Sequence, residues 1–167
     1  EECNDSVVRN NTVFANSLHG IVISQRSNHN LLEGNISYGN ALQGININDS
    51  AGTIVRGNSV FGNGEAGIGV GQGAAGTLLV GNTVRDNRKD GIYLFSAAVG
   101  TTLRDNSVSG NPRYGIYVKS AGNTIGAGNQ VFENGVGIFL NADPPPEVSL
   151  EANQIYANRE ANLRVAR

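Results

Sequence analysis

Several residue types are scarce or missing in this chain of 167 residues. Trp and Met are absent, aromatic residues make up 6% of the sequence, and Cys3 is the single cysteine. A lone cysteine excludes an internal disulfide framework, and no run of residues is apolar enough to span a membrane. The net charge of -2 comes without a basic stripe carrying interleaved aromatics, so we expect no nucleic-acid partner and no membrane insertion.

The usual catalytic and metal-binding motifs are missing as well. There is no Ser-His-Asp set, no HExxH helix and no paired-cysteine motif. The two histidines, His19 and His29, are interpreted as turn residues rather than metal ligands. We therefore expect no metal site and no cofactor.

Glycine and asparagine are abundant instead, and they recur at a fixed spacing. The chain contains 23 glycines and 23 asparagines, and 39% of its residues are hydrophobic. This composition favours short packed strands joined by many turns. A motif with two asparagines five residues apart occurs seven times, every 23 or 24 residues. Its copies begin at Asn11, Asn35, Asn58, Asn82, Asn106, Asn129 and Asn153.

A second feature follows each of the first six copies. It is a glycine followed by an alternating apolar strand pattern, as in Gly20-Ile21 with Ile23 and in Gly44-Ile45 with Ile47. Each repeat has room for three strands of three to five residues and three turns. The sequence therefore predicts an all-β, right-handed parallel β-helix, a solenoid like that of pectate lyase, with about seven coils of 22–25 residues in one domain over residues 1–167.

The recurring small and polar residues have an expected place in such coils. Asparagine tolerates the left-handed backbone of a tight turn, and its amide can bond to the same amide one coil away. The glycine before each isoleucine is expected to allow another sharp turn. Because the repeats run from Val7 to Val165, nearly to both ends, we expect the chain to be a segment of a longer solenoid.

Strand parity predicts which side chains face outward. If Ile21 and Ile23 point inward, the outward rows of the Gly-Ile strands gather aromatics and charges in the fourth to sixth coils. Those residues are Tyr93, Phe95, Tyr117, Lys119 and Phe139, with Asp90, Lys89, Arg113 and Tyr114 beside them on the incoming turn. Exposed rings suit the apolar faces of sugars and the cations suit uronate carboxylates, whereas the alternative is an aromatic ladder that only stabilises the helix.

Two other rows are interpreted as structural. One is an aromatic ladder, and the other partly alternates in charge and is expected to form solvated ion pairs. They consist of Phe14, Tyr38, Phe61, Phe132 and Tyr156, and of Arg9, Glu33, Arg56, Val80, Arg104, Ala127 and Glu151.

The run from Ser6 to Asn35 resembles the β-helix of mannuronan C5-epimerases, which convert mannuronate to guluronate in alginate, within a wider NosD-like group of carbohydrate-processing proteins. In that family an Asp-Pro-His-Asp or Asp-Pro-His-Glu coil precedes a coil reading His-Gly-Ile, two hydrophobic residues and Ser-Arg. The stretch from His19 to Arg26 is similar to this second coil, with Gln25 as an extra residue. The resemblance places Glu1 on the last acidic position of the first motif and its Asp-Pro-His before residue 1.

The resemblance implies a polysaccharide partner and a reaction in which a base removes the C5 proton and a proton returns to the opposite face. It implies Glu1 and Arg26 as candidate catalytic residues, Arg26 neutralising the carboxylate, and His19 as a substrate-binding residue. The upstream part of the same polypeptide would supply the histidine, so this segment alone is expected to be nearly inactive. The alternatives are a non-catalytic carbohydrate-binding or structural repeat module, and a NosD-type accessory protein, which the shortage of His, Cys and Met disfavours. A secreted or periplasmic location is expected.

Overall fold

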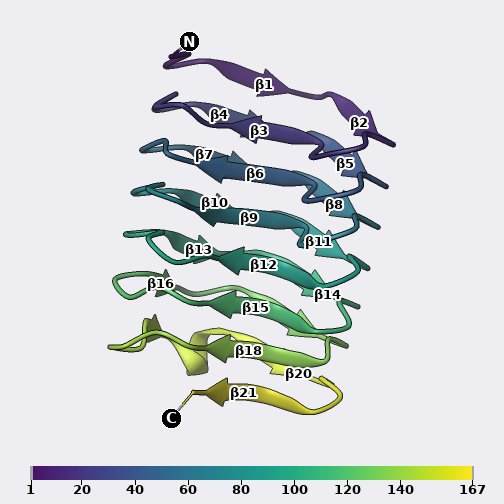
Figure 1. The fold of residues 1–167 in the computed structure, drawn as a ribbon. Coiled ribbons are helices and arrows are strands. Elements are labelled where there is room, and N and C mark those ends of the chain that lie inside the picture. The colour runs from purple at the N-terminus through teal and green to yellow at the C-terminus, as the bar shows by residue number, and fades with distance from the viewer. Residues whose placement is uncertain (1, 167) are drawn as a thin grey trace.

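The computed structural model describes residues 2–166, and these residues form a stack of coils with three parallel sheets (Figure 1). Each sheet contains seven strands, and each coil contributes one strand to each sheet. The predicted parallel β-helix is confirmed. A one-turn 3-10 helix, Leu150–Ala152, is inserted in the last coil.

The sheets are named A, B and C in the order in which the chain enters them. Sheet A contains β1 (Val7–Arg9), β4 (Leu31–Glu33), β7 (Ile54–Arg56), β10 (Leu78–Val80), β13 (Thr102–Arg104), β16 (Thr124–Ile125) and β19 (Glu147–Val148). Sheet B contains β2 (Thr12–Phe14), β5 (Ile36–Tyr38), β8 (Ser59–Phe61), β11 (Thr83–Arg85), β14 (Ser107–Ser109), β17 (Gln130–Phe132) and β20 (Gln154–Tyr156). Sheet C contains β3 (Ile21–Ile23), β6 (Ile45–Asn48), β9 (Ile68–Gly71), β12 (Asp90–Leu94), β15 (Tyr114–Val118), β18 (Val136–Leu140) and β21 (Ala161–Val165).

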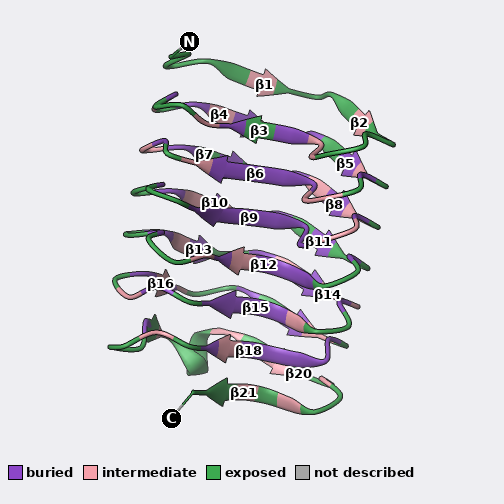
Figure 2. Ribbon diagram, in the orientation of Figure 1, coloured by how far each residue is buried: buried purple, intermediate pink, exposed green. Residues whose placement is uncertain are grey.

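Aliphatic side chains from all three sheets fill the interior. In the middle coils Leu79, Val84 and Ile92 are completely buried, and burial falls in the first and last coils (Figure 2). Full burial of one such side chain contributes about 1.5–3 kcal/mol, so the stacked interior is the main source of stability.

The repeated asparagines form two hydrogen-bonded ladders that run along the stack. Within each ladder, the backbone N–H and the side-chain NH2 of one asparagine donate to the side-chain oxygen of the next, as Asn58 does to Asn82 at 3.0 Å in both bonds. The members are Asn11, Asn35, Asn58, Asn82, Asn106, Asn129 and Asn153 in one ladder, and Asn16, Asn40, Asn63, Asn87, Asn111, Asn134 and Asn158 in the other.

The prediction that the ladder asparagines adopt the left-handed backbone conformation is wrong. The preceding residue has the positive φ instead, 63° at Gly57 before Asn58 and 55° at Asp86 before Asn87. The turn residue absorbs the reversal of the chain, which leaves the asparagine free to point inward and bond to its neighbours in the stack.

The glycines before the isoleucines are also explained differently from the prediction. Gly67 does not have a positive φ, and a Cβ built on it would lie 2.6 Å from Asn87 Nδ2 and against Val84. The same crowding recurs at Gly44 and Gly91. These positions require glycine because the next coil lies too close for a side chain, not because the backbone turns sharply there.

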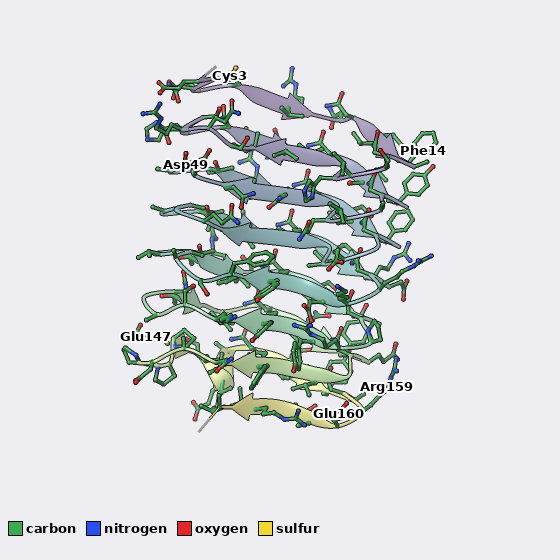
Figure 3. The ribbon with its side chains drawn as sticks, in the orientation of Figure 1. Cys3, Phe14, Asp49, Glu147, Arg159 and Glu160 are labelled. Carbon is green, nitrogen blue, oxygen red and sulfur yellow. The ribbon has the colours of Figure 1, made fainter. Side chains whose placement is uncertain are left out.

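The aromatic row forms a ladder as predicted, whereas among the described residues of the charged row a single ion pair joins two members. On sheet B the rings of Phe14, Tyr38 and Phe61 stack at 5.1 and 5.0 Å, Arg85 lies 4.5 Å over Phe61, and the stack begins at Phe14 (Figure 3). Farther along, the rings of the remaining pair are 5.3 Å apart, namely Phe132 and Tyr156. On sheet A an ion pair of 2.6 Å joins Glu33 to Arg56.

Candidate functional site

The outward face of sheet C carries the residues predicted to bind substrate. Its parity is as expected, because Val22 is 45% exposed whereas Ile21 and Ile23 are 9% exposed. The same register places Tyr93 opposite Gly69 and Tyr117, and Tyr117 opposite Phe139. The aromatic positions of successive coils are therefore brought into one row.

The rings on this face form a continuous stack. Tyr93 and Tyr117 are 4.6 Å apart between centroids, Tyr117 and Phe139 are 5.1 Å apart, and Phe95 leans on Tyr93 at 3.8 Å. Tyr114 closes one side, 4.9 Å from both Tyr117 and Phe139. We call these five residues the aromatic stack.

The expected exposure of Tyr117 is wrong, because its side chain is only 7% exposed. Neighbouring rings cover both of its faces, and its hydroxyl accepts a hydrogen bond of 3.1 Å from Asn141 Nδ2. Tyr93, Phe95 and Phe139 stay half-buried. The central ring therefore supports the stack, and the outer rings provide the accessible apolar surface.

Asp90 lies beside the stack and is buried with a cationic partner. It is 2% exposed, and Arg113 Nε lies 3.0 Å from its Oδ1 as an ion pair without hydrogen-bond alignment. The Arg113 guanidinium lies 4.8 and 5.4 Å over the rings of Tyr114 and Tyr117. Burial raises the pKa of Asp90 to about 6, and the attraction of Arg113 only partly opposes it.

We predict that Asp90 makes folding stability depend on pH. Because the folded-state pKa is above the ordinary value of 3.8, the folded protein binds more protons at Asp90 between about pH 4 and pH 6. The free energy of unfolding should therefore fall by about 2–3 kcal/mol as pH rises through this window. Asp90→Asn should remove this fall in urea denaturation, whereas Asp86→Asn, at an exposed carboxylate, should keep it; parallel curves for Asp90→Asn and the wild type would contradict the assignment.

Sequence reasoning missed a polar pocket next to the aromatic stack. It has a volume of about 330 Å³, and we call it the amide pocket; its lining residues are His19, Gln43, Asn46, Asn48, Gln72 and Phe95. The signal was present in the outward rows, where asparagines of one coil are followed by glycines in the next. The ring of Phe95 lies over Gly69 and Gly71, which have no side chains to obstruct it. A Cβ added to Gly69 would lie 3.0 Å from that ring.

His19 forms one wall of the amide pocket. Its Nε2 lies 3.4 Å from Asn46 Nδ2, and its Nδ1 is buried without a hydrogen-bond partner among the described residues. Burial lowers the pKa of His19, which favours the neutral ring. A neutral imidazole among amides suits hydroxyl groups better than it suits an anion.

Of the two candidate catalytic residues, Arg26 lies in the first coil, away from the aromatic stack of the fourth to sixth coils. Glu1 is outside the described residues. Arg26 follows β3, has a side chain 74% exposed and lies 3.2 Å from Glu2, whereas His19 precedes the same strand. The structure thus brings Asp90 together with the aromatic stack, and it does not bring Arg26 to His19.

The remaining predictions concern Lys119, His29, metal sites and membrane-spanning segments. Lys119 is exposed and occupies the outward position one coil after Phe95. His29 has a φ of 56° in a turn, as expected for a turn residue. Within residues 2–166 no three potential ligands gather into a metal site, and no helix there has the length and apolarity to cross a membrane.

Comparison with known proteins supports both the fold and the resemblance. A family model described as right handed beta helix region matches residues 1–84 and residues 72–166. A stretch of 67 residues is 37% identical to the mannuronan C5-epimerase of Pseudomonas putida and covers 40% of this chain and 13% of that protein. The resemblance to mannuronan C5-epimerases is therefore confirmed in sequence.

Solved structures show the same fold at low sequence identity. The A-module of the Azotobacter vinelandii mannuronan C-5 epimerase AlgE6 superposes with a TM-score of 0.76 at 18% identity, covering 98% of this chain and 58% of that one. The periplasmic alginate epimerase AlgG gives 0.74 at 23% identity, covering 98% and 39%. The chain thus spans only part of the length of the relatives it matches, and it belongs to the right-handed β-helix family.

Proposed function

We propose that this chain is the polyuronate-binding β-helix of a mannuronan C5-epimerase-like protein, and that alginate or a related polymer lies along the outward face of sheet C. One observation carries the proposal: amide, aromatic and cationic groups follow one another on this face. They run from the amide pocket, over Phe95 and Tyr93, to Arg113. The similarity to an enzyme named for mannuronan supports the choice of polymer.

Each group on this face matches one part of a uronate residue. The amides of Asn46 and Asn48 can donate to and accept from ring hydroxyls. The half-buried ring of Phe95 offers an apolar face to the C–H face of a pyranose. Arg113 has a half-exposed guanidinium, which can bind a carboxylate in two parallel hydrogen bonds.

Catalysis is proposed only for the longer protein. Arg26 is exposed and forms a surface ion pair with Glu2. In the proposed reaction Arg26 would leave this ion pair and neutralise the uronate carboxylate while a base takes the C5 proton. The resemblance implies that this base is a histidine in a coil before Glu1. The proposed location is secreted or periplasmic, in keeping with the periplasmic AlgG.

A non-catalytic module is the second candidate. The burial of Tyr117 and the closure of the aromatic stack favour it, because a ring that is 7% exposed serves stability rather than binding. A purely structural module would bind no sugar, either as the wild type or after removal of an outer ring. Removing the ring would change only its stability. Binding measurements therefore separate a purely structural module from the proposed polyuronate-binding β-helix.

We predict that Phe95→Leu weakens binding of mannuronate oligomers by about threefold to tenfold, because it removes the aromatic platform but keeps an apolar side chain. Phe61→Leu is the matched control, since Phe61 is a half-buried stacked ring on sheet B. Isothermal titration of the wild type and both variants measures the effect. Equal affinities for Phe95→Leu and wild type would remove Phe95 from the site, and no binding by the wild type would overturn the proposed function.

A further inference from the structure

The corner between sheets B and C changes its length in the sixth coil. Two residues, Pro112 and Arg113, separate the ladder residue Asn111 from Tyr114, whereas Gly135 alone separates Asn134 from Val136. In the last coil two residues again precede the paired position, Arg159 and Glu160 before Ala161. The sixth coil is therefore one residue short at this corner, and the residue that remains has no side chain.

A hollow of about 350 Å³ occupies this corner, and we call it the corner pocket. A Cβ on Gly135 would clash with the backbone oxygens of Pro112 and Arg113, so this position cannot fill the hollow with a side chain. Its charged and aromatic lining comes from the fourth, fifth and last coils. Glu160, which belongs to this lining, lies in the turn before β21 (Figure 3). These lining residues are Arg88, Lys89, Arg113, Tyr114, Glu160 and Arg164.

Cations dominate the corner pocket in a chain whose net charge is negative. Three of its four cations have carboxylate partners: Lys89 with Glu65 at 2.7 Å, Arg113 with Asp90 at 3.0 Å, and Arg164 with Glu160 at 3.1 Å. In the pairs of Lys89 and Arg164 both partners are accessible to solvent, at 32–60% exposure, so these two pairs are weak and can rearrange when an anion arrives. Arg113 stays beside the buried Asp90.

Arg88 is the fourth cation, and it is exposed with no ion pair to any described residue. An arginine without a carboxylate partner, next to a hollow that other guanidinium groups line, offers a planar donor set for a carboxylate.

We propose that the corner pocket is a subsite for a carboxylate of the bound polyuronate, separate from the amide pocket and from Arg26. The subsite rests on the proposed function, because its ligand is the same polymer. Arg113 lies at the boundary, since it lines both the corner pocket and the cavity beside Asp90 and Phe95. A polymer on sheet C would thus place neutral hydroxyls in the amide pocket and a carboxylate at the corner.

The test is titration of the double variant Arg88→Gln/Arg164→Gln with a mannuronate oligomer, a neutral mannose oligomer and inorganic phosphate. The matched control is Arg56→Gln/Arg104→Gln, which removes two charges from sheet A. We expect the first variant to bind the mannuronate oligomer about tenfold more weakly than wild type and the control to change affinity by less than about twofold. Thermal melts of both variants verify that these surface substitutions leave the fold intact.

The outcomes separate the two proposals. If wild type binds the mannuronate oligomer and Phe95→Leu weakens it, but both double variants bind alike, the corner subsite is overturned and the proposed function stands. If wild type binds no mannuronate oligomer, both are overturned. Phosphate that displaces the oligomer at equal concentration would show a general anion site and overturn the assignment to polyuronate.

Discussion

Replacing Asn106 by alanine is expected to lower the free energy of unfolding by about 3–5 kcal/mol. Asn106 is 1% exposed, and its Oδ1 accepts bonds of 3.0 Å from both the backbone N–H and the side-chain NH2 of Asn82. Its own NH2 donates to Leu79 O at 2.9 Å and to Asn129 at 3.0 Å. Alanine would leave several buried groups without partners, and each costs about 1–3 kcal/mol.

The matched control is Asn11→Ala in the first coil of the same ladder. Asn11 is exposed, and although it donates to Asn35 at 3.0 Å, the bonds described for its amide include none in which its oxygen accepts. We expect a loss of about 1 kcal/mol or less. Urea denaturation followed by circular dichroism measures both variants, and equal losses would contradict the assignment of stability to the ladders.

Gly91→Ala is expected to lower the free energy of unfolding by about 3 kcal/mol or to prevent folding. A Cβ on Gly91 would lie 2.6 Å from Gly115 O and 2.8 Å from Asn111 Nδ2, and it would clash with Val108. None of these three groups can move away easily. Gly115 O belongs to the backbone, Asn111 Nδ2 is a ladder amide, and Val108 is completely buried.

Gly126→Ala serves as its control. Gly126 also lacks a positive φ, but its Cβ would meet nothing closer than Leu103 O at 3.3 Å. Because alanine restricts the unfolded chain, we expect a change within about 1 kcal/mol of zero. Thermal and urea unfolding of both variants provide the measurement. If Gly91→Ala were as mild as Gly126→Ala, close approach of the coils would not be the reason for glycine at this row.

The fold was predictable because one period is repeated seven times. Two asparagines five apart and an alternating Gly-Ile strand specify a coil, and stacking equivalent positions specifies the sheets. The reasons for individual residues were less accessible. The left-handed turn residue turned out to be Gly57 or Asp86 rather than the asparagine that follows, because sequence spacing does not show which of two adjacent residues reverses the chain.

Strand parity predicted the row of aromatic residues on sheet C, but it predicted neither the burial of that row nor the amide pocket beside it. Parity placed Tyr93, Tyr117 and Phe139 in one row, yet it could not show that stacking would bury the middle ring. The amide pocket could not be predicted without the position of Phe95, whose ring lies over the glycines of the neighbouring coil. The corner pocket depends on the corner at Gly135 being one residue shorter than the equivalent corners of the neighbouring coils. The repeat pattern, which was identified from the asparagines and the Gly-Ile strands, does not show this difference.

The proposal of a polyuronate site on sheet C is tested most directly by the side-chain amide signals of asparagine in a nuclear magnetic resonance titration with a mannuronate oligomer. The signals of Asn46 and Asn48, which line the amide pocket, are predicted to shift in proportion to occupancy. Those of Asn82 and Asn106, buried in the ladder, are predicted to stay in place. Saturable binding with no shift at Asn46 or Asn48, or no binding at all, would contradict the proposal.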